Sequence, residues 1–182
     1  MGLTKNSMGN KLLVDDFNEI RKDIDFTIGL IGNPNVGKSS VFNNLTGLHQ
    51  HTGNWPGKTI ESSFGTYEYS NKKFLIVDLP GTYSLKAYSK EEDVTTSFIE
   101  KSQFDVMVVV VDATALERNL NLALQVLQIT KNVVVCVNLL DEAKKKNIKI
   151  NLKLLSDKLG VPVVGTIATK KKTLEELKEK II

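Results

Sequence analysis

The chain has 182 residues, of which 41% are hydrophobic and 25% are charged. This composition fits one globular domain with a substantial core and excludes a disordered or low-complexity chain. The longest apolar runs, Val106–Val111 and Val133–Val137, are far shorter than the roughly 20 residues that cross a bilayer. We therefore expect no membrane span and, from the polar N-terminus, no secretory signal. The single cysteine, Cys136, excludes an internal disulfide and favours a reducing cytosol.

The formal net charge of +3 is unevenly distributed. Residues 143–182 contain 11 lysines and 4 acidic residues, a net charge of +7, so residues 1–142 carry −4. Such a basic segment could bind RNA or an anionic membrane surface, or it could consist of solvated helix faces. We favour solvated faces, because net charge acts on solubility first.

Residues 1–25 are predicted to form an N-terminal extension to one domain over residues 26–182. In the extension, apolar residues recur at helical spacing among polar ones, at Leu13, Phe17, Ile20 and Ile24. This pattern predicts a short amphipathic helix. The sequence leaves open whether that helix packs on the domain, binds a partner or frays.

From Phe26 onward, strand-like apolar runs alternate with helical patterns. The predicted strands are 26–31, 74–77, 106–111, 133–137 and 161–167. The predicted helices are 39–45, 91–99, 116–129, 152–159 and 174–181. Runs so rich in Val and Ile are typical of parallel strands buried on both faces, with helices as crossovers.

One further run, Ile60–Tyr69, alternates polar and apolar residues and is predicted to be an edge strand, antiparallel to the next strand. The predicted fold is therefore an α/β three-layer sandwich around a mostly parallel sheet of about six strands. In such sheets, ligands bind beyond the carboxyl ends of the strands.

Residues Gly32–Ser39 match the pattern G-x-x-x-x-G-K-[ST], with a predicted strand before them and a predicted helix after them. The backbone N–H groups of such a loop bind phosphates at a helix N-terminus. Lys38 is expected to reach the β- and γ-phosphates, and the Ser39 hydroxyl to bind Mg²⁺. The predicted nucleoside triphosphate site includes Gly32, Asn33, Pro34, Asn35, Val36, Gly37, Lys38, Ser39 and Ser40.

A second motif, Asp78–Gly81 (DLPG), follows the predicted strand 74–77. An aspartate there is placed to hold the Mg²⁺ hydration shell, and Gly81 lets the backbone approach the γ-phosphate. The alternative, a Pro-Gly turn that only ends a strand, is disfavoured by the phosphate motif upstream. The residues assigned to the site here are Asp78, Leu79, Pro80 and Gly81.

A third motif, NLLD, ends the predicted strand 133–137 and has the N-x-x-D spacing of guanine-binding loops. A carboxylate can accept two hydrogen bonds from guanine N1–H and its exocyclic amine, whereas adenine offers no such pair of donors. The alternative is a polar helix cap. We predict GTP rather than ATP, bound by Asn138, Leu139, Leu140 and Asp141.

Three ordered motifs at three strand ends predict a P-loop GTPase domain. Beyond them, residues 51–59 (HTGNWPGKT), 78–85 (DLPGTYSL) and 116–120 (LERNL) resemble the cytosolic G domain of the ferrous iron transport protein B family. The resemblance covers residues 26–182. It implies a GTP-hydrolysing domain that gates or drives Fe²⁺ uptake at the cytoplasmic face of the cell membrane.

The resemblance also implies partners and switch segments. A helical regulatory domain and a membrane-spanning part are expected to follow residue 182, with small cytosolic accessory proteins as further partners. Residues 48–60 and 79–90 are expected to be the two nucleotide-sensing switches. In the first, Thr59 closes over Mg²⁺ and the γ-phosphate, and Trp55 is either a packing or a docking residue. The first-switch residues assigned to the nucleotide are Gly57, Lys58, Thr59 and Ile60.

Asn35 has a further implied role. In related GTPases, an asparagine at this position helps to hold a K⁺ ion beside the phosphates, which supplies positive charge to the transition state. Thr82 follows Gly81 where many GTPases carry a water-positioning glutamine. We therefore expect slow hydrolysis that is faster in K⁺ than in Na⁺, unless Asn35 only stabilises the loop turn.

The implied catalytic and metal-binding sets follow from these assignments. The catalytic residues are Lys38, Asn35, Thr59 and Gly81. The Mg²⁺ ligands, direct or through water, are Ser39, Thr59 and Asp78, and Asn35 is the K⁺ ligand.

Two features depart from general GTPase patterns, and a pair of histidines raises a separate question. Leu139 replaces the lysine that often covers the base, which predicts modest affinity and fast GDP release. The loop that backs the base is assigned to Ala168 and Thr169, without the usual first serine or threonine. His49 and His51 lie in the first switch, where two histidines alone make a poor metal site.

Two other classes remain as alternatives. A ribosome-assembly GTPase would bind RNA through the basic C-terminal quarter, with a steep salt dependence, but we expect no nucleic-acid partner. An ATP-driven P-loop enzyme is disfavoured by the N-x-x-D spacing. The sequence leaves self-association open.

Overall fold

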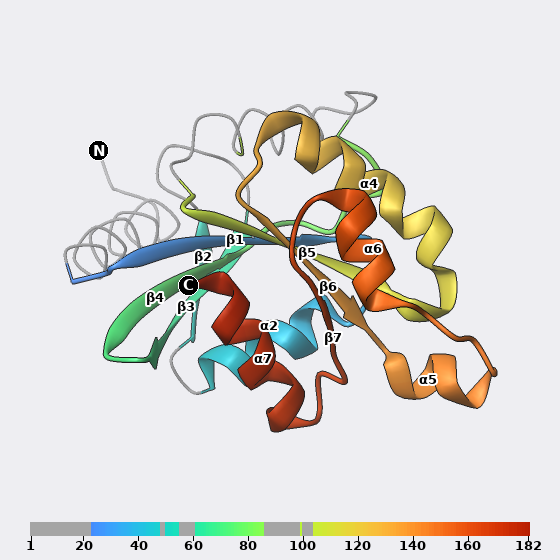
Figure 1. Cartoon of the computed structure of the whole chain (residues 1–182). Helices are drawn as coiled ribbons and strands as arrows, with labels where there is room; N and C mark the ends of the chain where they lie inside the picture. Colours follow the sequence, from blue (N-terminus) through green and yellow to red (C-terminus); the bar gives the residue numbers. More distant parts are fainter. Residues whose placement is uncertain (1–22, 48–49, 55–60, 86–98, 100–103) are drawn as a thin grey trace.

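Figure 1 shows the computed structural model, in which a central sheet lies between two layers of helices. The structure describes residues 23–47, 50–54, 61–85, 99 and 104–182. Their strands are β1 Phe26–Gly32, β2 Gln50–Asn54, β3 Glu61–Tyr69, β4 Lys72–Asp78, β5 Val106–Asp112, β6 Val133–Asn138 and β7 Val163–Gly165. Their helices are α2 Lys38–Thr46, the 3₁₀ helix η1 Ala113–Ala115, α4 Leu116–Ile129, α5 Leu140–Lys145, α6 Leu152–Leu159 and α7 Lys171–Ile181.

The described strands form one seven-stranded sheet with the order β2-β3-β4-β1-β5-β6-β7. Strands β4, β1, β5, β6 and β7 are parallel, whereas β3 is antiparallel to both β4 and β2. The predicted mostly parallel α/β sandwich is confirmed. The sheet has one more strand than predicted, because β2 pairs with the outer side of β3, so the run predicted as the edge strand lies inside the sheet.

Two apolar layers enclose the sheet, one on each face. One cluster joins strand residues to α4 and α6, and the other joins the alternate strand residues to α2 and α7. In β5, for example, Val109 and Val111 belong to the first cluster and Val108 and Val110 to the second, as the alternation of side chains along a strand requires. Burial on both faces explains why these strands are continuous Val/Ile runs.

The helices predicted from periodicity are confirmed where the structure describes them. Helices α4 and α6 have the predicted bounds, and α2 and α7 begin one and three residues before the predicted starts. Most of the predicted helix 91–99 and the N-terminal amphipathic helix lie outside the described residues. In the part of the chain that the structure describes, no helix is both long and apolar enough to cross a membrane.

Candidate nucleotide-binding site

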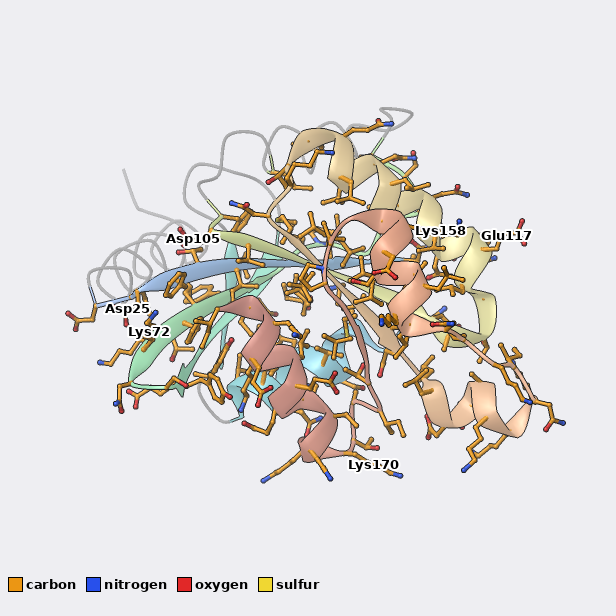
Figure 2. The ribbon with its side chains drawn as sticks, in the orientation of Figure 1. Asp25, Lys72, Asp105, Glu117, Lys158 and Lys170 are labelled. Atoms are coloured by element: carbon orange, nitrogen blue, oxygen red, sulfur yellow. The ribbon has the colours of Figure 1, made fainter. Side chains whose placement is uncertain are left out.

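The predicted motifs lie at one edge of the sheet, since the parallel strands that precede them run in the same direction. The phosphate loop (residues 32–38) follows β1, the DLPG segment (78–81) follows β4, the NLLD loop (138–141) follows β6, and the β7–α7 loop (166–170) follows β7. These strands are neighbours or next-but-one neighbours in the sheet. In Figure 2, Lys170 and Glu117 lie near this carboxyl edge, and Asp25 and Lys72 lie at the opposite edge.

The phosphate loop ends at an open helix N-terminus. Helix α2 begins at Lys38 and has neither a side-chain cap nor an acidic residue in its first turn. The first N–H groups of such a helix lack intrahelical partners and, with the helix dipole, favour an anion. The motif thus ends at a helix start whose N–H groups have no side-chain cap.

Gly37, which precedes α2, has the left-handed backbone angle φ +81°. A Cβ atom at this position would lie 2.4 Å from Asn138 Nδ2, closer than real Cβ contacts allow. Both the backbone angle and the contact require glycine here. The glycine of the motif thus serves the loop conformation and also lets the NLLD loop pack against it.

Lys38 and Asp78, assigned to phosphate and to Mg²⁺ respectively, form an ion pair. Lys38 Nζ donates a hydrogen bond to Asp78 Oδ1, and the two side chains are 12% and 15% exposed. Burial raises the pKa of the Asp78 carboxyl above its ordinary value, and the adjacent Lys38 ammonium acts in the opposite direction. The loops after β1 and β4 are therefore joined by a pair of opposite charges held largely out of solvent.

The DLPG segment is joined to the phosphate loop through the backbone. Leu79 N donates to Leu30 O at 2.9 Å, and Thr82 N donates to Gly32 O at 3.2 Å. A Cβ atom on Gly81 would lie 3.6 Å from Gly32 O and from Pro34. Gly81 thus lies beside the phosphate loop.

The residues after this segment are bound to α4 by Gln125, which the sequence reasoning did not identify. Gln125 Oε1 accepts hydrogen bonds from Ser84 Oγ at 3.1 Å and from Leu85 N at 2.6 Å. The predicted second switch therefore has an anchor on a helix at its described end. No motif marks Gln125, which stands beside the apolar Val126 in the helical pattern of residues 116–129.

Asn138 is fully buried and connects three loops. Its Nδ2 donates to Val36 O in the phosphate loop at 3.0 Å. Its Oδ1 accepts hydrogen bonds from Thr166 Oγ1 and Ala168 N, each at 3.1 Å. These interactions bring the predicted base-backing residue Ala168 beside the NLLD loop.

Asp141 lies in the first turn of α5, which follows Leu139 in the left-handed conformation at φ +64°. Leu140 N donates to Thr166 O at 3.3 Å, a second connection between the NLLD loop and the β7–α7 loop. Asp141 is partly exposed. Its carboxylate thus stands at a helix start, near the predicted base-backing loop, and keeps access to solvent.

The two asparagines of the phosphate loop differ in their surroundings. Asn33 is 2% exposed, and within the described residues neither polar atom of its side chain has a hydrogen-bond partner. Asn35 is exposed and adopts φ +66°, a conformation that asparagine tolerates better than most residues. The loop therefore contains an unpaired buried amide and an exposed amide.

Several predicted site residues lie outside the described residues. These are Trp55, the first-switch set Gly57, Lys58, Thr59 and Ile60, and also His49 and residues 86–90. His51 belongs to β2 through its backbone. Among the described residues, no group of three His, Cys, Asp or Glu side chains could hold a metal ion.

A phosphate loop, an aspartate after the neighbouring strand and an N-x-x-D loop on one mostly parallel sheet define the P-loop GTPase fold. The family model described as "Ferrous iron transport protein B" matches residues 26–181. The chain belongs to the ferrous iron transport protein B family.

Known relatives agree with this assignment. The Fe(2+) transporter FeoB of Escherichia coli K12 is 44% identical over 156 residues, which cover 84% of this chain and 20% of the transporter. The G domain of the T. maritima FeoB iron transporter is 41% identical with a TM-score of 0.79, covering 86% of this chain and 96% of that one. An S. thermophilus NFeoB variant bound to GDP is 42% identical with a TM-score of 0.79, covering 86% and 61%. The chain spans about a fifth of the length of the curated relatives that it matches.

Proposed function

We propose that residues 26–182 form the G domain of a ferrous iron transporter, which binds GTP with Mg²⁺ and hydrolyses it to GDP and phosphate, and that residues 1–25 are an extension of it. The observation that carries this proposal is the placement of the phosphate loop, Asp78 and the NLLD loop at one sheet edge. The GDP bound to the S. thermophilus relative supports a guanine nucleotide.

The described residues suit a Mg²⁺-nucleotide. The open N-terminus of α2 and Lys38 would bind the phosphates, and Ser39 and Asp78 would hold the ion together with Thr59. When bound, Mg²⁺ neutralises charge that develops on the transferred phosphoryl group. The Lys38–Asp78 ion pair places both groups at this sheet edge, and each would exchange its partner for phosphate or for the metal. The amide of Asn33, which has no hydrogen-bond partner among the described residues, is a further polar group that could bind phosphate.

Selection of guanine is assigned to Asp141, with Asn138 acting indirectly. All three hydrogen bonds of the Asn138 side chain are made to protein atoms. Its contribution is therefore to hold the loops around the base, with Ala168 and Thr169 behind it. Asp141 supplies the carboxylate that accepts from N1–H and the exocyclic amine of guanine.

Asp141→Asn should weaken GTP binding by about 100-fold, because two charge-assisted hydrogen bonds are lost. The same variant should gain affinity for XTP, since xanthine carries a carbonyl where guanine carries the amine, and the asparagine amide can donate to it. Titration with fluorescent analogues of both nucleotides measures this change. Asp157→Asn, at an exposed position of α6, is the matched control. Unchanged GTP affinity in Asp141→Asn would remove Asp141 from this role.

GTP turnover should be at least about tenfold faster in K⁺ than in Na⁺ at equal ionic strength, because K⁺ held by Asn35 adds positive charge beside the phosphates. Asn35→Ala should lose the difference, whereas Asn132→Ala, at an exposed position before β6, should keep it. ATP is the control substrate. Equal rates in both salts would contradict the K⁺ role alone, and turnover of ATP would contradict the guanine assignment.

The remaining proposals concern the whole transporter. The G domain would lie at the cytoplasmic face of the membrane and would gate or drive Fe²⁺ uptake through a membrane-spanning part, with accessory proteins as further partners. A nucleic-acid role is not proposed for the basic C-terminal segment. Lys145 of this segment pairs with Glu142 of its own helix and is 69% exposed, in keeping with a solvated helix face.

A further inference from the structure

We propose that the side-chain amide of Asn33 is the hydrogen-bond partner of Thr82 and Ser84 in the GTP-bound domain, and that this pairing favours GTP over GDP. Asn33 is in this proposal a positioning residue, because it acts on the nucleotide through the residues that follow the DLPG segment. The proposal rests on the proposed function, since it concerns the same site. It goes beyond that function by assigning a role to a side chain that the phosphate motif leaves unspecified.

The Asn33 side chain is buried without a hydrogen bond. Asn33 is 2% exposed, and neither Nδ2 nor Oδ1 has a partner within the described part of the chain. An unpaired buried amide raises the free energy of the arrangement that contains it, because its bonds to water are lost and not replaced. An arrangement of the loops that offers this amide both a donor and an acceptor is therefore favoured.

Thr82 lies opposite Asn33 where the ladder between β1 and β4 continues beyond the two strands. In a parallel ladder, an N–H that donates to the carbonyl of one residue belongs to the partner of the next residue. Thr82 N donates to Gly32 O at 3.2 Å, so the partner of Thr82 is Asn33. Partners on neighbouring strands direct their side chains to the same face of a sheet. The Thr82 hydroxyl and the Asn33 amide are therefore neighbours.

The face that the two side chains share is the one covered by α4. Ile31, two residues before Asn33, belongs to the apolar cluster on that face, as do Leu79 and Leu85. Side chains alternate along a strand, so Asn33 faces the same side as Ile31. Helix α2, whose N-terminus is the predicted phosphate site, packs on the opposite face. This placement favours protein groups over phosphate as the partners of the amide.

Binding of a third phosphate gives Thr82 a reason to move. Gly81, which is predicted to contact the γ-phosphate, directly precedes Thr82. The next bond of the ladder, from residue 34 to Thr82 O, cannot form, because Pro34 has no N–H. Gln125 holds Ser84 on α4, so a shift of Thr82 toward the phosphate would open the turn between Thr82 and Ser84. GDP has no γ-phosphate and would leave this turn closed.

The hydrogen bonds of this turn can be exchanged without loss. In this structure, Thr82 Oγ1 donates to Ser84 O at 2.6 Å and accepts from Ser84 N at 3.3 Å. In the open turn, the Thr82 hydroxyl would donate to Asn33 Oδ1, and Asn33 Nδ2 would donate to Ser84 O. Each donor then has an acceptor, and the amide that is unpaired here gains two hydrogen bonds. The gain is made only with GTP, so Asn33 raises the preference for GTP.

The test compares the affinity for a nonhydrolysable GTP analogue with the affinity for GDP, both by isothermal titration. Asn33→Leu keeps the size of the side chain and removes both polar atoms, and we expect the ratio of the two affinities to fall about tenfold. Thr82→Val should lower the ratio similarly, whereas Thr82→Ser keeps the hydroxyl and should stay within about twofold of wild type. The double variant Asn33→Leu/Thr82→Val should fall no further than either single variant, since both remove the same interaction.

A second readout is thermal stability without nucleotide, for which Asn119→Leu is the matched control. Asn119 is also a buried asparagine, but its Nδ2 donates to Ala115 O at 2.8 Å and its Oδ1 accepts from Asp112 N at 3.4 Å. Asn33→Leu should raise the melting temperature by roughly 2–4 °C, because an apolar side chain replaces an unpaired buried amide. Asn119→Leu should lower the melting temperature and keep the wild-type affinity ratio.

Three results would overturn the proposal: a wild-type affinity ratio in Asn33→Leu, a melting temperature of Asn33→Leu that falls as in Asn119→Leu, or effects of Asn33→Leu and Thr82→Val that add in the double variant. The last result is the one expected if the amide bonds to phosphate instead of Thr82. If Asn33→Leu does not fold, equal affinity ratios in Thr82→Val and Thr82→Ser would overturn the proposal. Failure of the wild-type protein to bind either nucleotide would instead overturn the proposed function, and the melting temperatures, which need no nucleotide, separate the two failures.

Discussion

Lys38→Ala is expected to reduce GTP affinity by more than about 100-fold and to abolish measurable turnover. The ammonium group stands at the first residue of α2, where it would donate charge-assisted hydrogen bonds to two phosphates, each worth about 1.5–3 kcal/mol. No other described lysine forms an ion pair with Asp78. Titration with a fluorescent GTP analogue and a phosphate-release assay measure the two effects.

Lys178→Ala is the control for this variant. Lys178 has similar exposure, 16%, and also pairs with an acid, Glu175, but it lies on α7 and away from the phosphate loop. The Lys178→Ala variant should retain wild-type affinity for GTP. Thermal melts without nucleotide should show Lys38→Ala to be the less stable variant, because the Asp78 carboxylate loses its buried partner. Wild-type GTP affinity in Lys38→Ala would disprove the assignment of Lys38 to the phosphates.

The effect should extend to the whole transporter if the G domain controls it. In a full-length relative, the substitution equivalent to Lys38→Ala should abolish GTP-dependent Fe²⁺ uptake. The amount of transporter in the membrane should stay unchanged. Lys178→Ala should keep uptake. Uptake that persisted in Lys38→Ala would separate iron transport from the nucleotide cycle of this domain.

The parallel core of the fold could be predicted because burial on both faces produces a local signal. Strands β5 and β6 are rich in Val. The helical spacing of apolar residues over 116–129 predicted both ends of α4. Strand β2 has no such signal, since its five residues, QHTGN, include no apolar side chain. Its formation depends on pairing with β3, a contact that no local pattern contains.

The chemistry of the site was predictable where one loop carries it. The phosphate loop and the DLPG segment each group their predicted functional residues within a few positions, so spacing alone was enough to predict them. The role of Asn138 is different, because its partners Val36 and Thr166 lie 102 and 28 residues away in the chain. Only the sheet order, which sets β6 between β5 and β7, brings these groups together.

Helix α5 shows a third limit. It has six residues and begins after a leucine in the left-handed conformation, so it is too short for a helical period and starts with a residue that rarely adopts φ > 0. The helix-cap alternative for Asp141 and the guanine-binding role are compatible in this geometry. An aspartate in the first turn of a helix is stabilised by the helix dipole and can still present its carboxylate to a base.

Gly37→Ala is expected to lower nucleotide affinity by more than about 100-fold in a domain that still folds. The substitution adds strain of about 1–2 kcal/mol at φ +81°, and its Cβ atom would meet Asn138 Nδ2 at 2.4 Å. Asn138 is fully buried among hydrogen-bond partners, so it cannot move without breaking its link to Val36. The loop around the phosphates and the loop around the base would therefore be disturbed together.

Gly160→Ala separates the two causes. Gly160, which ends α6, has a similar φ of +69°, but a Cβ atom there would meet nothing within 4 Å. This control carries the backbone strain without the contact, and it should lose stability while keeping nucleotide affinity. Isothermal titration with GDP and thermal melts of both variants measure the difference. The contrary result is that Gly37→Ala and Gly160→Ala lose stability equally and both bind GDP as wild type does. The contact between residue 37 and Asn138 would then have no part in holding the nucleotide, and the link between the phosphate loop and the NLLD loop would not affect binding.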